Sequence, residues 1–177
     1  MKLIGHTEIT GSAANSIVFN SIPQQYSELY LILNFRGSPG SQGFETCIRF
    51  NDATSAYYSK HASATTGSIS SGSNAYGPDE LYLGNVNGSS SMANGFGSQR
   101  VHIPGYSSSL YKVVDYCATG AGSSQYGLIG TGIWESTDSI TKIEVGPRFG
   151  LSETLLVGSS ASLYAITADT FGGTTVS

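Results

Sequence analysis

Charged residues are scarce in this chain. Of its 177 residues, 8 are Lys or Arg and 12 are Asp or Glu, so 11% are charged and the net charge is −4. This low and slightly acidic charge excludes a basic nucleic-acid-binding domain, and we expect no nucleic acid among the partners.

Cysteine is also rare. The two cysteines, Cys47 and Cys117, are too few and too far apart to form a zinc knuckle or a disulfide framework. Each lies in an apolar or alternating run, so we expect a small buried side chain at both positions. A single long-range disulfide between them is the alternative.

Long hydrophobic runs are missing. The longest, residues 29–33, is far too short to span a membrane, and the apolar pair near the N-terminus is too short for the core of a signal peptide. The sequence therefore predicts a protein made in the cytoplasm, with no membrane partner.

Small, turn-forming residues are abundant instead. Ser, Thr and Gly together occupy 67 positions, a composition that disfavours helices and excludes a helical bundle or a coiled coil. Eleven Tyr, seven Phe and one Trp supply enough apolar area to argue against disorder. The length suits one domain, which we place at residues 1–168, followed by a polar tail at 169–177.

Apolar and polar residues alternate along many short segments, as expected for β-strands. The clearest is 28–36, where one face is wholly apolar and should lie in the core: Leu29, Leu31, Leu33 and Phe35. The other face mixes aromatic and polar residues, as expected near solvent or a partner: Tyr30, Ile32, Asn34 and Arg36. Further strands are expected near 16–20, 46–50, 100–103, 110–117, 126–134, 140–145 and 161–166. About ten such strands predict an all-β, antiparallel β-sandwich, jelly-roll-like, with a closed barrel as the alternative.

Two stretches, 62–78 and 84–98, are rich in Ser, Thr, Gly and Asn and are predicted to be long loops. Ordering such loops costs conformational entropy, so we expect them to pack on a neighbouring subunit.

Several aromatic residues lie in or beside these loops and are candidates for interface or ligand contacts, because exposed aromatic rings anchor interfaces and stack on sugars. They are Tyr57, Tyr58, Tyr76, Phe96, Tyr106 and Tyr126. Tyr57 and Tyr58 are adjacent, so on a strand one of them must point outward.

No catalytic residue, metal site or cofactor is predicted, and we expect no enzyme. The three histidines, His6, His61 and His102, belong to no recognisable motif, and the chain contains no Gly-x-Ser-x-Gly nucleophile elbow. Two carboxylate pairs, Asp79 with Glu80 and Glu135 with Asp138, leave polysaccharide cleavage as a minor alternative.

Several segments taken together resemble a family of bacteriophage virion structural proteins, known from heads, tails and fibres of cyanophage-like viruses. They span nearly the whole chain and comprise residues 16–23, 29–36, 48–52, 57–58, 101–106, 132–137, 140–143 and 162–166. The resemblance implies a β-rich structural module without catalytic residues, located in the virion.

Because the chain carries no long fibre shaft, the resemblance favours a capsid decoration (cement) protein that stabilises the head through oligomeric contacts. Its partners would be the major capsid protein or tail proteins and further copies of itself, in a homo-oligomer such as a trimer. A tail or tail-fibre component that binds host-surface glycans is the alternative.

Overall fold

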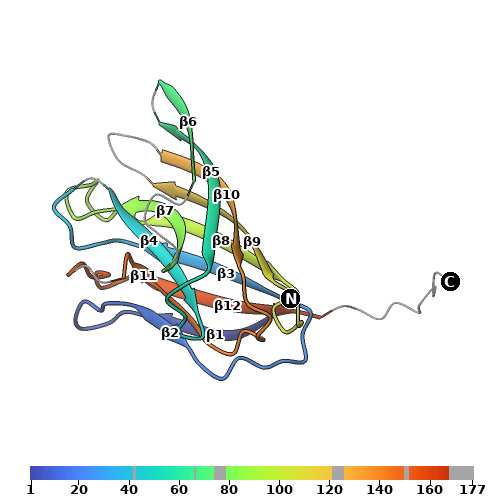
Figure 1. The fold of residues 1–177 in the computed structure, drawn as a ribbon. Coiled ribbons are helices and arrows are strands. Elements are labelled where there is room, and N and C mark those ends of the chain that lie inside the picture. Colours follow the sequence, from blue (N-terminus) through green and yellow to red (C-terminus); the bar gives the residue numbers. More distant parts are fainter. Residues whose placement is uncertain (42, 66, 74–78, 121–125, 150–151, 168–177) are drawn as a thin grey trace.

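A computed structural model describes residues 1–41, 43–65, 67–73, 79–120, 126–149 and 152–167, and these residues form strands and connections without a helix (Figure 1). The strands are β1 (Lys2–Glu8), β2 (Ile17–Phe19), β3 (Glu28–Phe35), β4 (Gly43–Phe50), β5 (Tyr57–Thr65), β6 (Ser68–Ser73), β7 (Leu81–Asn87), β8 (Gly97–Pro104), β9 (Lys112–Gly120), β10 (Tyr126–Trp134), β11 (Ile143–Pro147) and β12 (Ser160–Ile166). The predicted polar tail, 169–177, lies outside the described residues.

The strands form two antiparallel sheets of unequal size. One has eight strands in the order β1-β12-β3-β8-β9-β10-β5-β6, and the other has four in the order β2-β11-β4-β7. The small sheet lies against one face of the large sheet, with β7 packed on β8, β9, β10 and β5, and β2 packed on β12. The predicted all-β, antiparallel β-sandwich is confirmed, and the two sheets do not close into a barrel.

Strand β3 is an interior strand of the large sheet and supplies a large part of the core. Leu29, Leu31, Leu33 and Phe35 are completely buried, as the alternation of the sequence predicts. Burying each such side chain contributes about 1.5–3 kcal/mol, which explains why this segment pairs on both sides, with β12 and β8.

The loop predicted at 62–78 is largely strand where the structure describes it, so that prediction is wrong, whereas the loop predicted at 84–98 is confirmed over residues 88–96. Residues 62–78 contain the end of β5 and all of β6, and residues 84–98 contain most of β7 and the start of β8. Their Ser, Thr, Gly and Asn residues have low intrinsic strand preference, but pairing with neighbouring strands outweighs it.

An aromatic cluster holds the two sheets together. The rings of Tyr57 and Trp134 are stacked at 6.1 Å, and Phe50 of the small sheet tilts against both. The hydroxyl of Tyr57 accepts a hydrogen bond from the Phe50 N–H at 2.8 Å and donates one to the Phe50 carbonyl. A phenol can be buried here because its polar end is satisfied by the backbone.

A buried carboxylate organises the outer side of the small sheet. Glu80 is 5% exposed, accepts a hydrogen bond from the Phe149 N–H at 2.9 Å, and lies 3.7 Å from Arg49 and 3.5 Å from Arg148. The Arg49 guanidinium also lies over the Phe149 ring, 4.2 Å from its centroid. This ion cluster closes over Cys47, which is fully buried.

Both cysteines are free thiols, so the alternative of a disulfide is wrong. Cys47 is the small buried side chain that was expected, whereas Cys117 is only half-buried. Cys117 lies at an outward position of β9, where one side of the residue faces solvent.

Candidate interaction surface

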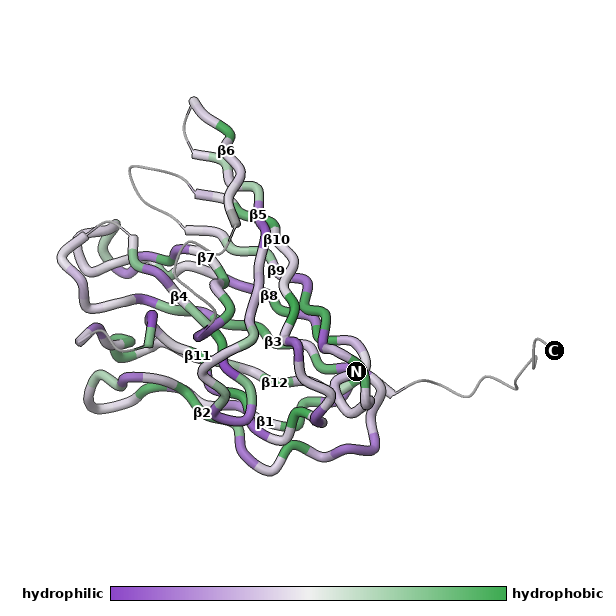
Figure 2. The backbone as a smooth tube through the Cα atoms, viewed as in Figure 1, coloured by the Kyte–Doolittle hydropathy of each residue, from purple (hydrophilic) through white to green (hydrophobic). Residues whose placement is uncertain are grey.

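The outer face of the large sheet, which points away from the small sheet, carries unusually many apolar side chains. Strands β3, β5, β6, β9 and β10 all contribute exposed large hydrophobic residues to it: Ile32, Tyr58, Ile69, Val113, Ile129 and Ile133. Figure 2 shows one such hydrophobic segment in β6, at the end of the sheet remote from β1. We call this set the outer apolar face.

Strand register makes the outer apolar face continuous across three strands. Ile133 of β10 lies directly opposite Tyr58 of β5 on one side and Val113 of β9 on the other. Four residues earlier in β10, beyond Thr131, Ile129 lies opposite Ala62 and Cys117 in the same way. Directly opposed side chains in antiparallel strands lie about 4.5–5.5 Å apart at Cβ, so each row forms one apolar strip.

Strand β10 places two small residues inside and two large apolar residues outside. Gly130 and Gly132 face inward, where neighbouring side chains fill the space: a Cβ at Gly132 would lie 2.2 Å from Leu81, and one at Gly130 would lie 2.4 Å from the Tyr116 ring. Ile129 and Ile133, which alternate with these glycines, point outward. Packing alone does not require large apolar residues at these solvent-facing positions.

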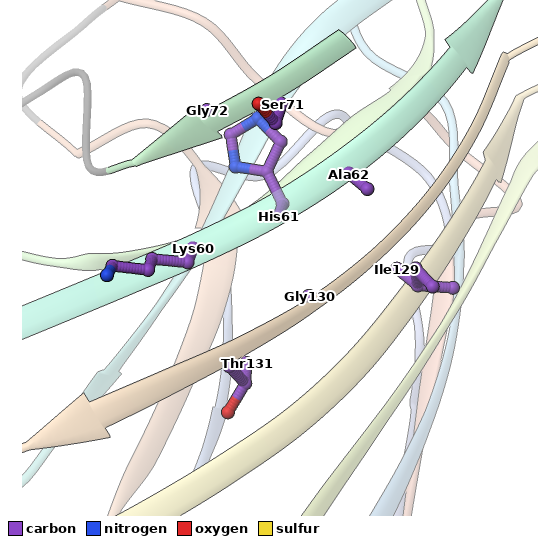
Figure 3. Close-up of a pocket in the computed structure, with 8 residues that line it drawn as sticks. All are labelled: Lys60, His61, Ala62, Ser71, Gly72, Ile129, Gly130 and Thr131. Atoms are coloured by element: carbon purple, nitrogen blue, oxygen red, sulfur yellow. The ribbon is translucent and has the colours of Figure 1, made fainter. Parts of the chain in front are cut away.

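Two shallow hollows lie at the β5–β6–β10 end of the large sheet. One, of about 360 Å³, is almost wholly apolar and includes Ala64, Ile69, Cys117, Gly127 and Ile129 in its lining. The other, of about 650 Å³, is more polar and is lined by the eight residues of Figure 3: Lys60, His61, Ala62, Ser71, Gly72, Ile129, Gly130 and Thr131. Both are open depressions, suited to receiving side chains of a partner.

His61 is the one imidazole in the lining of the larger hollow. Its ring packs against Tyr82 at 5.3 Å between centroids and against the bare backbone of Gly72. Burial lowers the pKa of His61, which keeps the ring neutral at pH 7. Its Nδ1 atom has no hydrogen-bond partner among the described residues, and the described lining holds no carboxylate that would orient the ring for catalysis.

A polar patch borders the outer apolar face on β3 and β8. His102 Nε2 lies 2.6 Å from a Glu28 carboxylate oxygen, and the His102 ring tilts against Tyr30. On the neighbouring strand β9, Asp115 lies directly opposite His102. The outer face therefore combines the apolar rows of β5, β9 and β10 with charged groups on β3 and β8, and one polar row, Lys60, Thr131 and Asp115, separates the two apolar rows.

The tyrosine candidates divide by burial. Tyr58 is 53% exposed on the outer apolar face. Tyr57 and Tyr106 are completely buried, so the expectation that they contact a partner or ligand is wrong. Tyr57 belongs to the aromatic cluster, and the Tyr106 hydroxyl donates to the Pro23 carbonyl, so both phenols hold the fold together.

The remaining aromatic candidates have less access to a partner. Phe96 is half-buried, with its ring against Gly158. Tyr126 is half-buried as well, and burial raises its pKa while a hydrogen bond with Tyr82 opposes that rise. Tyr76 lies outside the described residues. The contact role of Tyr58, Phe96 and Tyr126 stays a prediction.

Sequence reasoning did not single out the isoleucines of the outer apolar face. The signal was present in β10, where Ile129 and Ile133 alternate with Gly130 and Gly132. Glycines within a strand indicate a bulge or a close approach, and at Gly130 and Gly132 side chains of other strands do approach closely.

One of the two carboxylate pairs noted in the sequence, Asp79 with Glu80, contains a buried carboxylate that is already paired. Glu80 is enclosed by two arginines, and no group of three or more His, Cys, Asp or Glu residues in that part of the chain is placed to hold a metal ion. Within the same residues, no helix has the length and apolar character needed to cross a membrane.

Comparison with known proteins gives no relative for this chain: no family model, no curated protein and no solved structure matches it.

Proposed function

We propose that this protein is a bacteriophage virion structural protein that decorates and cements the head. The observation that carries the proposal is the outer apolar face, which exposes large hydrophobic side chains in continuous rows. Soluble monomers rarely expose contiguous apolar patches larger than a few hundred Å², and larger ones mark interaction sites. The segments that resemble virion proteins, quoted above from the sequence, indicate what kind of partner covers this face.

The sandwich would act as a rigid block docked on the assembled shell. Its partners would be the major capsid protein or tail proteins together with further copies of the chain, and its location would be the virion. A protein that binds the assembled shell better than free subunits stabilises assembly by mass action, by about 2.7 kcal/mol at a concentration 100 times its Kd. No catalytic step is part of this function.

Mass spectrometry of purified phage particles, followed by cryo-electron microscopy, tests the proposal. We expect the protein in the particle at a copy number that matches shell symmetry, with the outer apolar face covered. Absence from the particle, or a position in which this face stays exposed, would overturn the proposal.

A pair of variants tests the role of the face itself. Ile129→Lys places a charge at a position that is 68% exposed, so it should leave folding intact and weaken binding to the shell by about tenfold or more. Val157→Lys is the matched control, because Val157 is also exposed but lies in a turn outside the large sheet. Equal binding by both variants would show that the outer apolar face is not the contact.

A tail or tail-fibre component that binds host-surface glycans is the second candidate, and the exposure of Tyr58 favours it. Tyr58 shares its face with Lys60, and Thr131 lies opposite Lys60, so an aromatic ring is flanked by hydrogen-bonding groups. A glycan array with the wild-type protein and Tyr58→Ala separates the two: specific binding that this variant loses would support the glycan-binding function, and no binding would eliminate it.

A further inference from the structure

The described part of the sandwich has four edge strands, β1 and β6 in the large sheet and β2 and β7 in the small one. An edge strand offers unpaired backbone N–H and C=O groups to any other strand, and proteins usually block such edges with charges, prolines, bulges or short length. Three of these edges are blocked in one of these ways, and β6 is not.

Each blocked edge has its own device. β2 has only three residues. β1 carries Lys2 and Glu8 and is bulged between Leu3 and Gly5. β7 is bulged near Gly84, which has a φ of 110°, and its last residue, Asn87, accepts a hydrogen bond from the Gly37 N–H.

β6 has none of these features. Its six residues, Ser-Ile-Ser-Ser-Gly-Ser, include no charge and no proline, and their pairing with β5 is regular from Lys60–Ser73 to Thr65–Ser68. The side chains of Ser68, Ser70 and Ser71 are exposed, and Ile69 is 85% exposed, the highest value among the large hydrophobic residues. In an antiparallel pair every second residue directs its backbone groups away from the partner, so β6 offers a row of donors and acceptors that no other described strand pairs with.

We infer that β6 is a self-association edge: two copies of the chain join through antiparallel pairing of β6 with β6 about a twofold axis, which makes one continuous sheet from two large sheets. A second copy is the occupant that the chemistry favours. In isologous pairing a strand lies against the same strand of a second copy. Like charges that meet across the twofold axis destabilise such a pair. β6 carries no charge and pairs with β5 without a bulge, whereas β1 is bulged between Leu3 and Gly5.

The neighbouring charges do not oppose this arrangement. The nearest charged residue, Lys60 of β5, lies opposite Ser73 at one end of β6. Antiparallel pairing about an axis at Ser71, in which opposed residues share a face of the sheet, places the two Lys60 residues about four residues apart along the strand and three strand spacings apart across it. With about 3.4 Å per residue and about 4.8 Å per strand, the separation is about 20 Å. This exceeds the screening length of about 8 Å at physiological salt.

The experiment is sedimentation equilibrium of the purified full-length chain over a range of concentrations, combined with hydrogen exchange. We expect the mass to rise from 18.5 kDa towards twice that value, and the amides of β6 to gain protection over the same concentrations. A monomer at every concentration, or a dimer without added protection in β6, would overturn the inference.

Variants separate this edge from the other surfaces. Ile69→Lys and Ser71→Lys, both at exposed positions, should weaken dimerisation by about tenfold or more. Ser71→Lys places two lysines opposite each other at the axis, and Ile69→Lys adds to β6 the kind of charge that blocks an edge strand. Leu3→Lys on the opposite edge and Ile129→Lys on the outer apolar face should leave the dimer unchanged. A dimer that survives both β6 variants contradicts the inference. Since none of these measurements involves phage particles, their outcome is independent of the proposed function.

Discussion

Replacing Glu80 by Gln would test whether the buried ion cluster on the small sheet stabilises the fold. The variant keeps the size of the side chain but removes the charge that lies between Arg49 and Arg148. It also weakens the acceptor for the Phe149 N–H. The Cys47 thiol beneath the cluster stays in place, so the change is electrostatic rather than one of packing.

The expected cost follows from the burial of the three charged groups. Removing one partner of a buried ion pair costs about 3–5 kcal/mol, because the remaining charge stays desolvated. The arginine side chains here are 20% and 31% exposed, so water solvates part of each guanidinium. We therefore expect the free energy of unfolding to fall by about 2–3 kcal/mol, which lowers the Tm of a domain of this size by about 4–12 °C.

Urea unfolding at pH 7, followed by the fluorescence of Trp134, measures this change. Trp134 is buried in the aromatic cluster between the sheets and is the single tryptophan, so its emission reports global unfolding. Glu8→Gln is the matched control, since Glu8 is exposed on β1, and it should change stability by less than about 0.5 kcal/mol. If Glu80→Gln also stays within that range, the cluster does not stabilise the fold.

Further predictions follow from buried titratable groups. Burial raises the pKa of Tyr57 and of Tyr116 to about 12, so between pH 10 and 12 the unfolded chain loses phenolic protons that the folded protein keeps. These groups should therefore leave the free energy of unfolding unchanged below pH 10 and lower it above pH 10, by about 2–3 kcal/mol for each tyrosine by pH 12. The variant Tyr57→Phe should show a smaller decrease. A urea midpoint that is the same at pH 9 and pH 11.5 would refute this prediction. Burial and the neighbouring Glu80 raise the pKa of the Cys47 thiol, whereas Cys117 is half-buried on the outer face. A thiol reagent should thus modify at most one cysteine, Cys117, in the native protein and both in urea, and rapid native modification of both would contradict the structure.

The alternation of apolar and polar residues predicted the architecture and the core strand β3 well. Leu29, Leu31, Leu33 and Phe35 form one apolar face in the sequence and are all completely buried. The alternation predicted strand positions and orientations less well where strands lack large residues on their inner face. β6 contains only Ser, Gly and one Ile, and the middle of β10 has Gly130 and Gly132 inside and Ile129 and Ile133 outside, so neither shows the usual alternation.

Sequence reasoning located little of the candidate interaction surface. Tyr58 was identified, because two adjacent strand residues must face opposite ways. Which of Tyr57 and Tyr58 points inward depends on the partner strands, and Tyr57 is buried because Phe50 and Trp134 of other strands enclose it. Ile129, Ile133 and Val113 form one surface only through the register of β9, β10 and β5.

By itself, the order of residues determined that this chain would be an all-β sandwich with a large aromatic and aliphatic core, since strand formation follows from local alternation and composition. Tertiary structure decided the rest: how twelve strands divide into sheets of eight and four, which edges are protected, and which apolar residues remain outside. These outcomes depend on contacts between residues far apart in the chain, and a local pattern cannot specify which distant strand will cover a given face.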